Sequence, residues 1–168
     1  MRKIFLVSTL FILFSFFTGC GIATKNLYEG PAKKADEVST ISGVAFYRDR
    51  AVSIITWKID DKDVDHDRTS EFIVLPGNHT VRLYVKKDFQ IGMIGQTIKS
   101  SWQEKLLDVT LNAKAGHTYI ADVEVSGDFV RAYFKDMGQD FKRECMPLRR
   151  FAVAYGGSSD GRRDGCND

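Results

Sequence analysis

Short segments in which apolar and polar residues alternate follow one another along most of the chain. Residues 79–87, HTVRLYVKK, show this most clearly, because Val81, Leu83 and Val85 share one face of an extended strand. Successive side chains of a strand point to opposite faces, so a period of two predicts a strand with one buried face. The alternation recurs at 105–112, 118–125 and 130–135, and two further short apolar segments, 53–59 and 70–75, are also predicted to be strands.

Turn-forming residues separate these segments, notably Pro76-Gly77-Asn78, Ala115-Gly116-His117 and the sequence SGDF at 126–129. No segment after residue 20 has a long helical period, and only 136–145 is compatible with one or two helical turns. Six to eight short strands in one domain predict an all-β fold. We expect a small antiparallel β-sandwich, or alternatively an open barrel.

The first 19 residues have a different character. Arg2 and Lys3 precede about fourteen mostly apolar residues, IFLVSTLFILFSFF. A helix that spans a bilayer needs ~20 apolar residues, so this segment is too short to span it. A positive start followed by a short apolar run instead predicts a signal peptide over residues 1–19.

The segment ends in Phe17-Thr18-Gly19-Cys20, which resembles the lipobox of bacterial lipoproteins, although Phe17 stands where Leu is usual. The resemblance implies that Cys20 is the site of lipid attachment: it receives a diacylglyceryl thioether, cleavage follows before it, and its new amine is acylated. The alternative is an ordinary cleaved signal peptide followed by a chance cysteine. Gly21, rather than Asp, comes next, which favours the periplasmic face of the outer membrane over the inner membrane.

These features predict four regions: the signal peptide 1–19, a lipidated tether 20–38 that leads into the domain, a β-sandwich domain 39–156, and a flexible polar tail 157–168. Residues 20–168 hold 22 of the 24 basic residues, since Arg2 and Lys3 precede them, and all 22 acidic ones. A chain without net charge lacks the basic surface that nucleic acid requires, so we expect no nucleic-acid partner. The membrane is a partner through the lipid on Cys20.

Two further cysteines, Cys145 and Cys166, form an even pair in an oxidising compartment. We predict a disulfide between them, and two free thiols are the alternative. The closed loop of about twenty residues corresponds to ~3 kcal/mol of stabilisation in the chain-entropy treatment. A metal site at these cysteines is disfavoured, because no CxxC motif or histidine pair lies nearby.

The sharpest candidate for a functional site is an acidic run with carboxylates at every second position: Asp61, Asp63, Asp65 and Asp67. An EF-hand loop that starts at Asp61 needs glycine at its sixth position and glutamate at its twelfth. Here His66 and Phe72 occupy those positions, and the flanks are strand-like. The EF-hand is therefore rejected. A calcium site of another kind stays open beside the favoured interpretation, a solvent-exposed hairpin loop, and we assign no metal or cofactor.

The sequence contains no HExxH or CxxC, and its one GxSxG pattern, at 157–161, falls in the polar tail rather than in a strand-to-helix elbow. Its three histidines are His66, His79 and His117. His79 and His117 each follow a turn at the start of a strand, and we expect their rings to bond a loop backbone. No catalytic residue is assigned and no enzyme is expected. The alternative is a small hydrolytic or metal-dependent module that uses His66 and the acidic run 60–67.

Three short motifs carry a family resemblance: Tyr28-Glu29-Gly30-Pro31, Leu75-Pro76-Gly77-Asn78-His79 and Gly116-His117-Thr118-Tyr119. Over residues 28–125 the chain resembles an uncharacterised family of small proteobacterial lipoproteins, and its central part is similar to the PEGA-type surface β-domain. The resemblance implies a β-domain and no established reaction. The chain departs from the family at Asp60-Asp61, where Asp-Gly is usual.

One apolar connection remains, QIGMIGQTIK at 90–99. It lacks the Gly-Lys-Ser/Thr ending of a phosphate-binding loop. Either it folds back on the core, or the segment 88–101 contacts an envelope protein or a polymer such as peptidoglycan. The sequence thus predicts a lipid-anchored cell-envelope protein that serves as a non-enzymatic binding or structural module in the periplasm.

Overall fold

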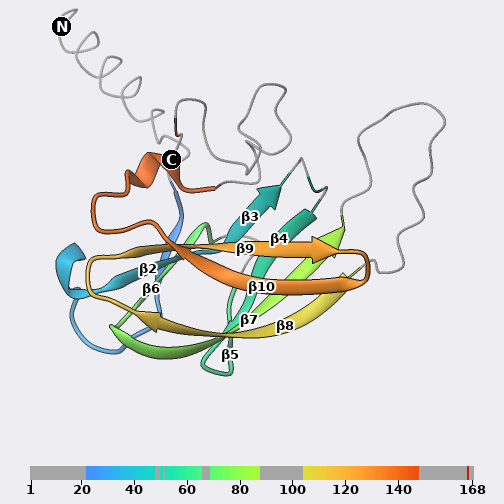
Figure 1. Cartoon of the computed structure of the whole chain (residues 1–168). Coiled ribbons are helices and arrows are strands. Elements are labelled where there is room, and N and C mark those ends of the chain that lie inside the picture. The colour runs from blue at the N-terminus through green and yellow to red at the C-terminus, as the bar shows by residue number, and fades with distance from the viewer. Residues whose placement is uncertain are drawn as a thin grey trace, which may run out of the picture.

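The computed structural model describes residues 22–47, 50, 52–65, 69–87, 104–147 and 166, which form two β-sheets around one core (Figure 1). Sheet A contains, in spatial order, β1 (Thr24–Asn26), β6 (Glu71–Val74), β2 (Ser39–Ser42), β9 (Thr118–Ser126) and β10 (Phe129–Asp136). Sheet B contains β3 (Val44–Tyr47), β4 (Val52–Ile59), β7 (Gly77–Lys87) and β8 (Glu104–Ala113), and β5 (Lys62–Asp63) pairs with β4. Two short 3-10 helices are η2 (Ala35–Glu37) and η3 (Arg143–Cys145).

The predicted all-β sandwich is confirmed, because the described strands form two separate sheets and not a closed barrel. The core lies between the inner faces of the sheets. Sheet A contributes Ile41, Phe72, Val74, Tyr119, Ala121 and Val123, and sheet B contributes Ala45, Ile54, Val81, Leu83 and Val85. In β7 every second residue from Val81 to Val85 lies in the core, as the period of two predicts.

All six predicted strands are present, but two expectations about them need correction. Sheet B is antiparallel as predicted, whereas sheet A is mixed, because β1 runs parallel to β6 and β2 runs parallel to β9. In β9, Thr118, Ile120 and Asp122 are buried as well as the predicted inner face. The single buried face predicted for 118–125 is therefore wrong.

The chain segment after β10 explains the burial of the outer face of sheet A. Phe72 points into the core, so its neighbour Glu71 points to the outer face of sheet A. Arg143 forms an ion pair with Glu71, which shows that residues 137–147 pass over this outer face. Met146 in this segment is 1% exposed. Of the helical turns expected over 136–145, only η3 forms, at the far end of that segment.

β2 and β3 are almost continuous, and Gly43 is the corner at which the chain passes from sheet A to sheet B. Its N–H donates to the carbonyl of Ser70, and its own carbonyl accepts from the N–H of Thr56. A Cβ atom on residue 43 would lie 2.6 Å from the carbonyl oxygen of Thr69. The close approach of backbone to backbone at this corner therefore requires glycine.

The folded domain starts earlier than the boundary predicted at residue 39. Residues 24–26 form β1 and pair with β6, and Leu27 donates to the carbonyl of Ile73. The region predicted as a tether thus enters sheet A by residue 24. The predicted signal peptide 1–19, Cys20, the segment 88–101 and all of the predicted tail 157–168 except Cys166 lie outside the described residues.

Candidate functional site

The acidic run begins as a tight hairpin. Asp60 and Asp61 have φ values of 51° and 62°, and Lys62 pairs with Ile59 directly across them. A two-residue turn with both central residues at positive φ suits the twist of the strands that flank it. The run was expected to be a loop, but its first residues after the turn, Lys62 and Asp63, form β5.

The carboxylates of this run point to separate partners. Asp60 accepts from the N–H of Thr80 at 3.0 Å and contacts the ring of His79, while Asp63 forms an ion pair with Lys58 at 3.1 Å. Asp61 and Asp65 are exposed. Among the described residues no group of three or more His, Cys, Asp or Glu side chains is arranged to hold a metal ion. Asp67 and His66 lie outside those residues.

His79 connects two turns of the sandwich. Its Nδ1 lies 2.6 Å from Oδ2 of Asp60 and its Nε2 lies 2.7 Å from the carbonyl oxygen of Leu75. The contact with the Leu75 carbonyl agrees with the prediction that the His79 ring bonds a loop backbone. Both ring nitrogens of His79 thus lie within hydrogen-bond distance of oxygen atoms of the protein itself.

His117 has a different partner from the predicted loop backbone. Its Nδ1 lies 2.7 Å from Oδ1 of Asp136, and its ring lies beside that of Tyr119. The expectation of a backbone partner is wrong, because antiparallel pairing of β9 and β10 places Asp136 opposite Tyr119. Burial tends to raise the pKa of Asp136, but hydrogen bonds from His117 and the N–H of Gly138 outweigh it, so this pKa is lowered.

The burial of Asp122 is not expected from the strand pattern of 118–125, which places this residue opposite the predicted inner face. This carboxylate is 6% exposed and accepts hydrogen bonds from Arg50 at 2.8 Å, the N–H of Val123 at 2.6 Å and the hydroxyl of Tyr133 at 3.2 Å. The guanidinium of Arg50 also lies over the ring of Tyr47, 4.0 Å from its centroid. Burial raises the pKa of Tyr133, and the charge of Asp122 adds to this. The group connects the β3–β4 turn to β9 and β10.

A second buried carboxylate, Glu71 on β6, is 2% exposed. Its Oε1 accepts from the hydroxyl of Thr24 at 2.5 Å and forms an ion pair with Arg143. Glu71 on β6 thus contacts both β1, near the start of the described chain, and η3, near the end of its continuous part. A buried charge is tolerated when it is paired and hydrogen-bonded, so Arg143 and Thr24 are what allows Glu71 at this place.

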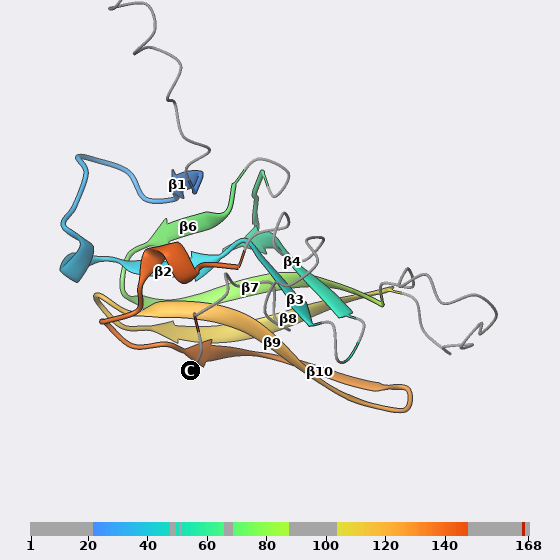
Figure 2. The same cartoon turned by 90° about the horizontal axis from the view of Figure 1, so that it is seen from above.

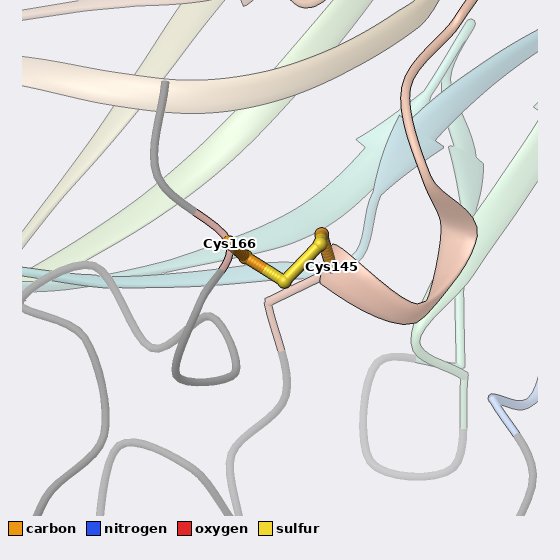
Figure 3. Close-up of a disulfide and its surroundings, with 2 residues drawn as sticks. All are labelled: Cys145 and Cys166. Carbon is orange, nitrogen blue, oxygen red and sulfur yellow. A yellow bond between two sulfur atoms is a disulfide. The ribbon is translucent and has the colours of Figure 1, made fainter.

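The disulfide between Cys145 and Cys166 closes the C-terminal segment (Figure 3). The sulfur atoms lie 1.99 Å apart and the Cα atoms 5.5 Å apart. Of the two alternatives that the sequence left open, the structure contains the bonded pair. Both cysteines are buried, and Cys145 lies two residues after Arg143.

The outer face of sheet B carries a row of apolar side chains across its four main strands. Val44, Ile55, Tyr84 and Leu106 are successive cross-strand partners. Trp57, which is 36% exposed, lies next to this row with its ring centroid 5.9 Å from that of Tyr84. Leu106 is 57% exposed. Beside the row, Arg82 binds Asp108 through two hydrogen bonds, and these lower the pKa of Asp108.

Neither His79 nor His117 has a serine, threonine or cysteine side chain among its hydrogen-bond partners in the described part of the chain. The titratable clusters instead join strand ends, turns and the two terminal segments. In that same part of the chain no helix combines the length and apolar character needed to cross a membrane.

Comparisons with models of protein families, with curated proteins and with solved structures found no match to this chain. The resemblance to proteobacterial lipoproteins and the PEGA-type domain therefore stays a prediction from short motifs.

Proposed function

We propose that this chain is a lipid-anchored cell-envelope protein whose β-sandwich is a non-enzymatic binding or structural module at the periplasmic face of the outer membrane. The observation that carries the proposal is Phe17-Thr18-Gly19-Cys20 at the end of a short apolar segment. Three acyl chains on Cys20 anchor a protein durably, since each buried CH2 adds ~0.8 kcal/mol.

The folded domain supports this proposal in two ways. Its disulfide between Cys145 and Cys166 suits an oxidising compartment outside the cytoplasm. Its histidines and buried carboxylates hold strands and termini together, which suits a binding or structural module better than a hydrolase. Within the described part of the acidic run, Asp60 and Asp63 have separate partners, which supports the interpretation as a hairpin connection over the calcium-dependent alternative.

Mass spectrometry of the mature N-terminus tests the anchor. We expect the chain to begin at Cys20 with a diacylglyceryl group and an acylated amine, and to sediment with membranes. Cys20→Ser should abolish the modification and release the protein, whereas the matched variant Cys166→Ser should keep it. An unmodified Cys20 in the wild-type protein would reject the proposal.

The choice of membrane has its own test. Gly21→Asp should move the lipidated protein from the outer-membrane to the inner-membrane fraction, because aspartate after the lipidated cysteine usually retains lipoproteins there. Gly21→Ser is the matched control and should leave the protein in the outer-membrane fraction. An unchanged distribution of the aspartate variant would contradict the proposed localisation.

We propose that the partner, an envelope protein or a polymer such as peptidoglycan, binds through residues 88–101, which are rich in isoleucine. A photo-crosslinking residue in place of Ile94 should capture that partner in intact cells. The same residue in place of Asp128, in the β9–β10 turn, is the control and should not. Equal capture at both positions would reject the assignment.

A further inference from the structure

β1 ties the start of the chain to one edge of sheet A. It pairs in parallel with β6, from Thr24 opposite Glu71 to Asn26 opposite Ile73. Before the strand, the carbonyl of Ala23 accepts from the N–H groups of Ser70 at 2.8 Å and Glu71 at 3.2 Å. The chain is thus part of the sheet from residue 23 onward.

Side chains hold this strand as well as its backbone does. The hydroxyl of Thr24 donates to buried Glu71, which also pairs with Arg143. After the strand, Leu27 donates to the carbonyl of Ile73 and packs against the core. Release of β1 would leave the Glu71 carboxylate with fewer partners inside the protein, which opposes fraying of this short strand.

The distance from Cys20 to this strand is short. Three residue steps separate Cys20 from Ala23, and a fully extended chain advances at most about 3.6 Å per residue, so the two Cα atoms lie within about 11 Å. A lipid on Cys20 sits in the bilayer interface. The edge of sheet A formed by β1 therefore has to lie at the level of the lipid headgroups.

We infer that the β1 edge of sheet A is a membrane-facing surface, so that the anchor fixes the orientation of the domain as well as its location. The inference rests on the proposed lipidation of Cys20. Exposed Lys25, in the centre of β1, places an ammonium group where it meets the phosphates of the headgroups.

The opposite edge of sheet A faces away from the membrane. Figure 2 shows β1 and β10 at opposite edges of the molecule, and the strand order places β10 four strands away from β1. At about 4.8 Å per strand this is about 19 Å. Phe129, 61% exposed beside the β9–β10 turn, and exposed Arg131 then lie on the side of the domain farther from the membrane.

Fluorescence quenching in vesicles tests this orientation. Full-length lipidated Lys25→Cys and Arg131→Cys, each labelled with a small fluorophore, are placed in vesicles of phosphatidylethanolamine and phosphatidylglycerol that contain lipids with nitroxide headgroups. Only the new thiol reacts, because Cys20 carries lipid and the other two cysteines form the disulfide. We expect several-fold stronger quenching at position 25 than at position 131. Asn26→Cys is the second probe of the same edge if Lys25→Cys does not fold.

A linker variant provides the matched control. About fifteen Gly and Ser residues inserted between Gly21 and Ile22, with a root-mean-square span of about 20 Å, should bring the quenching at the two positions close together. Equal quenching in the lipidated chain of native length would overturn the orientation and leave the proposed anchor intact. A measured mass that shows no acyl chains on Cys20 would reject both the orientation and the anchor.

Discussion

Two histidine–aspartate pairs in the described part of the chain occur at comparable places. His79 is the third residue of β7 and contacts Asp60, which directly follows β4; His117 directly precedes β9 and contacts Asp136, the last residue of β10. In each pair the aspartate also accepts a backbone N–H, that of Thr80 or that of Gly138. In each pair, the contact between the imidazole and the carboxylate joins neighbouring strand ends. This structural role accounts for the titratable groups at these positions.

The pair of His117 and Asp136 predicts a dependence of stability on pH. Because the folded-state pKa of Asp136 is lowered, its stabilisation is present above the unfolded pKa of ~3.9 and is lost as pH falls through the folded value. Asp136→Asn should therefore lower the free energy of unfolding at pH 7, and the difference from wild type should shrink below about pH 4.

Urea denaturation at pH 7 and at pH 3 measures this difference. Asp140→Asn, at an exposed position of the following segment, is the control and should have little effect at either pH. A deficit of Asp136→Asn that is the same at both pH values would show that the carboxylate does not act through its charge.

The hairpin turn makes a second prediction at the residue scale. Asp61 has a φ of 62°, a conformation that costs most residues with a Cβ 1–2 kcal/mol, aspartate less, and glycine nothing. Asp61→Gly should raise the free energy of unfolding by up to about 1 kcal/mol. Asp60→Gly should not, because the Asp60 carboxylate binds His79 and the N–H of Thr80. Thermal unfolding of both variants measures the contrast; equal gains would mean that the Asp60 contacts contribute nothing.

At the scale of elements, the corner between β2 and β3 brings backbone segments into close contact. Strands that change sheets form the corners of such folds, and here Gly43 lies against the carbonyl oxygens of Thr69 and Ser70. The same close approach lets Gly43 donate to Ser70 and accept from Thr56. Gly43 therefore connects the backbones of the two sheets at this end of the sandwich.

Gly43→Ala should destabilise the domain by about 1–3 kcal/mol, because its Cβ has to displace the Thr69 backbone. Ser42→Ala is the matched neighbour. The Ser42 hydroxyl is buried and lacks a hydrogen-bond partner, so its removal should be neutral or slightly stabilising. Chemical denaturation of the two variants measures the difference, and a neutral Gly43→Ala would show that the corner relaxes at no cost.

At the scale of the whole molecule, the two ends of the described chain meet on sheet A. Arg143, next to the disulfide, contacts both Thr24 and Glu71, although 119 residues separate it from Thr24. The disulfide closes the C-terminal segment beside β1 and β6. The part of the domain nearest to the proposed anchor is therefore also held by contacts between residues far apart in the chain.

Removal of this cross-link should weaken the whole domain. The double variant Cys145→Ser and Cys166→Ser should unfold with a free energy about 3 kcal/mol lower than wild type, as expected for a closed loop of this length. Urea denaturation with and without reductant provides the measurement. Reductant should lower the stability of wild type to that of the variant and leave the variant unchanged; wild type as stable with reductant as without it would contradict the prediction.

The order of residues alone was sufficient for the local features of this fold. Alternation in 79–87 predicted the inner face of β7, because the period of a strand is a property of consecutive residues. Turn residues separated the strands for the same reason, and the all-β sandwich followed from them. The cysteine pair followed from its count and from the compartment that the N-terminus predicts.

Only the tertiary structure decided which distant segments meet. Residues 24–26, predicted to belong to a tether, pair with β6 and are part of sheet A. The register of β9 with β10 places Asp136 beside His117. The segment after β10 covers sheet A, so Glu71 could not be recognised as buried from strand periodicity. Burial and pairing depend on residues far away in the chain, and their free energies are set by contacts that no local pattern contains.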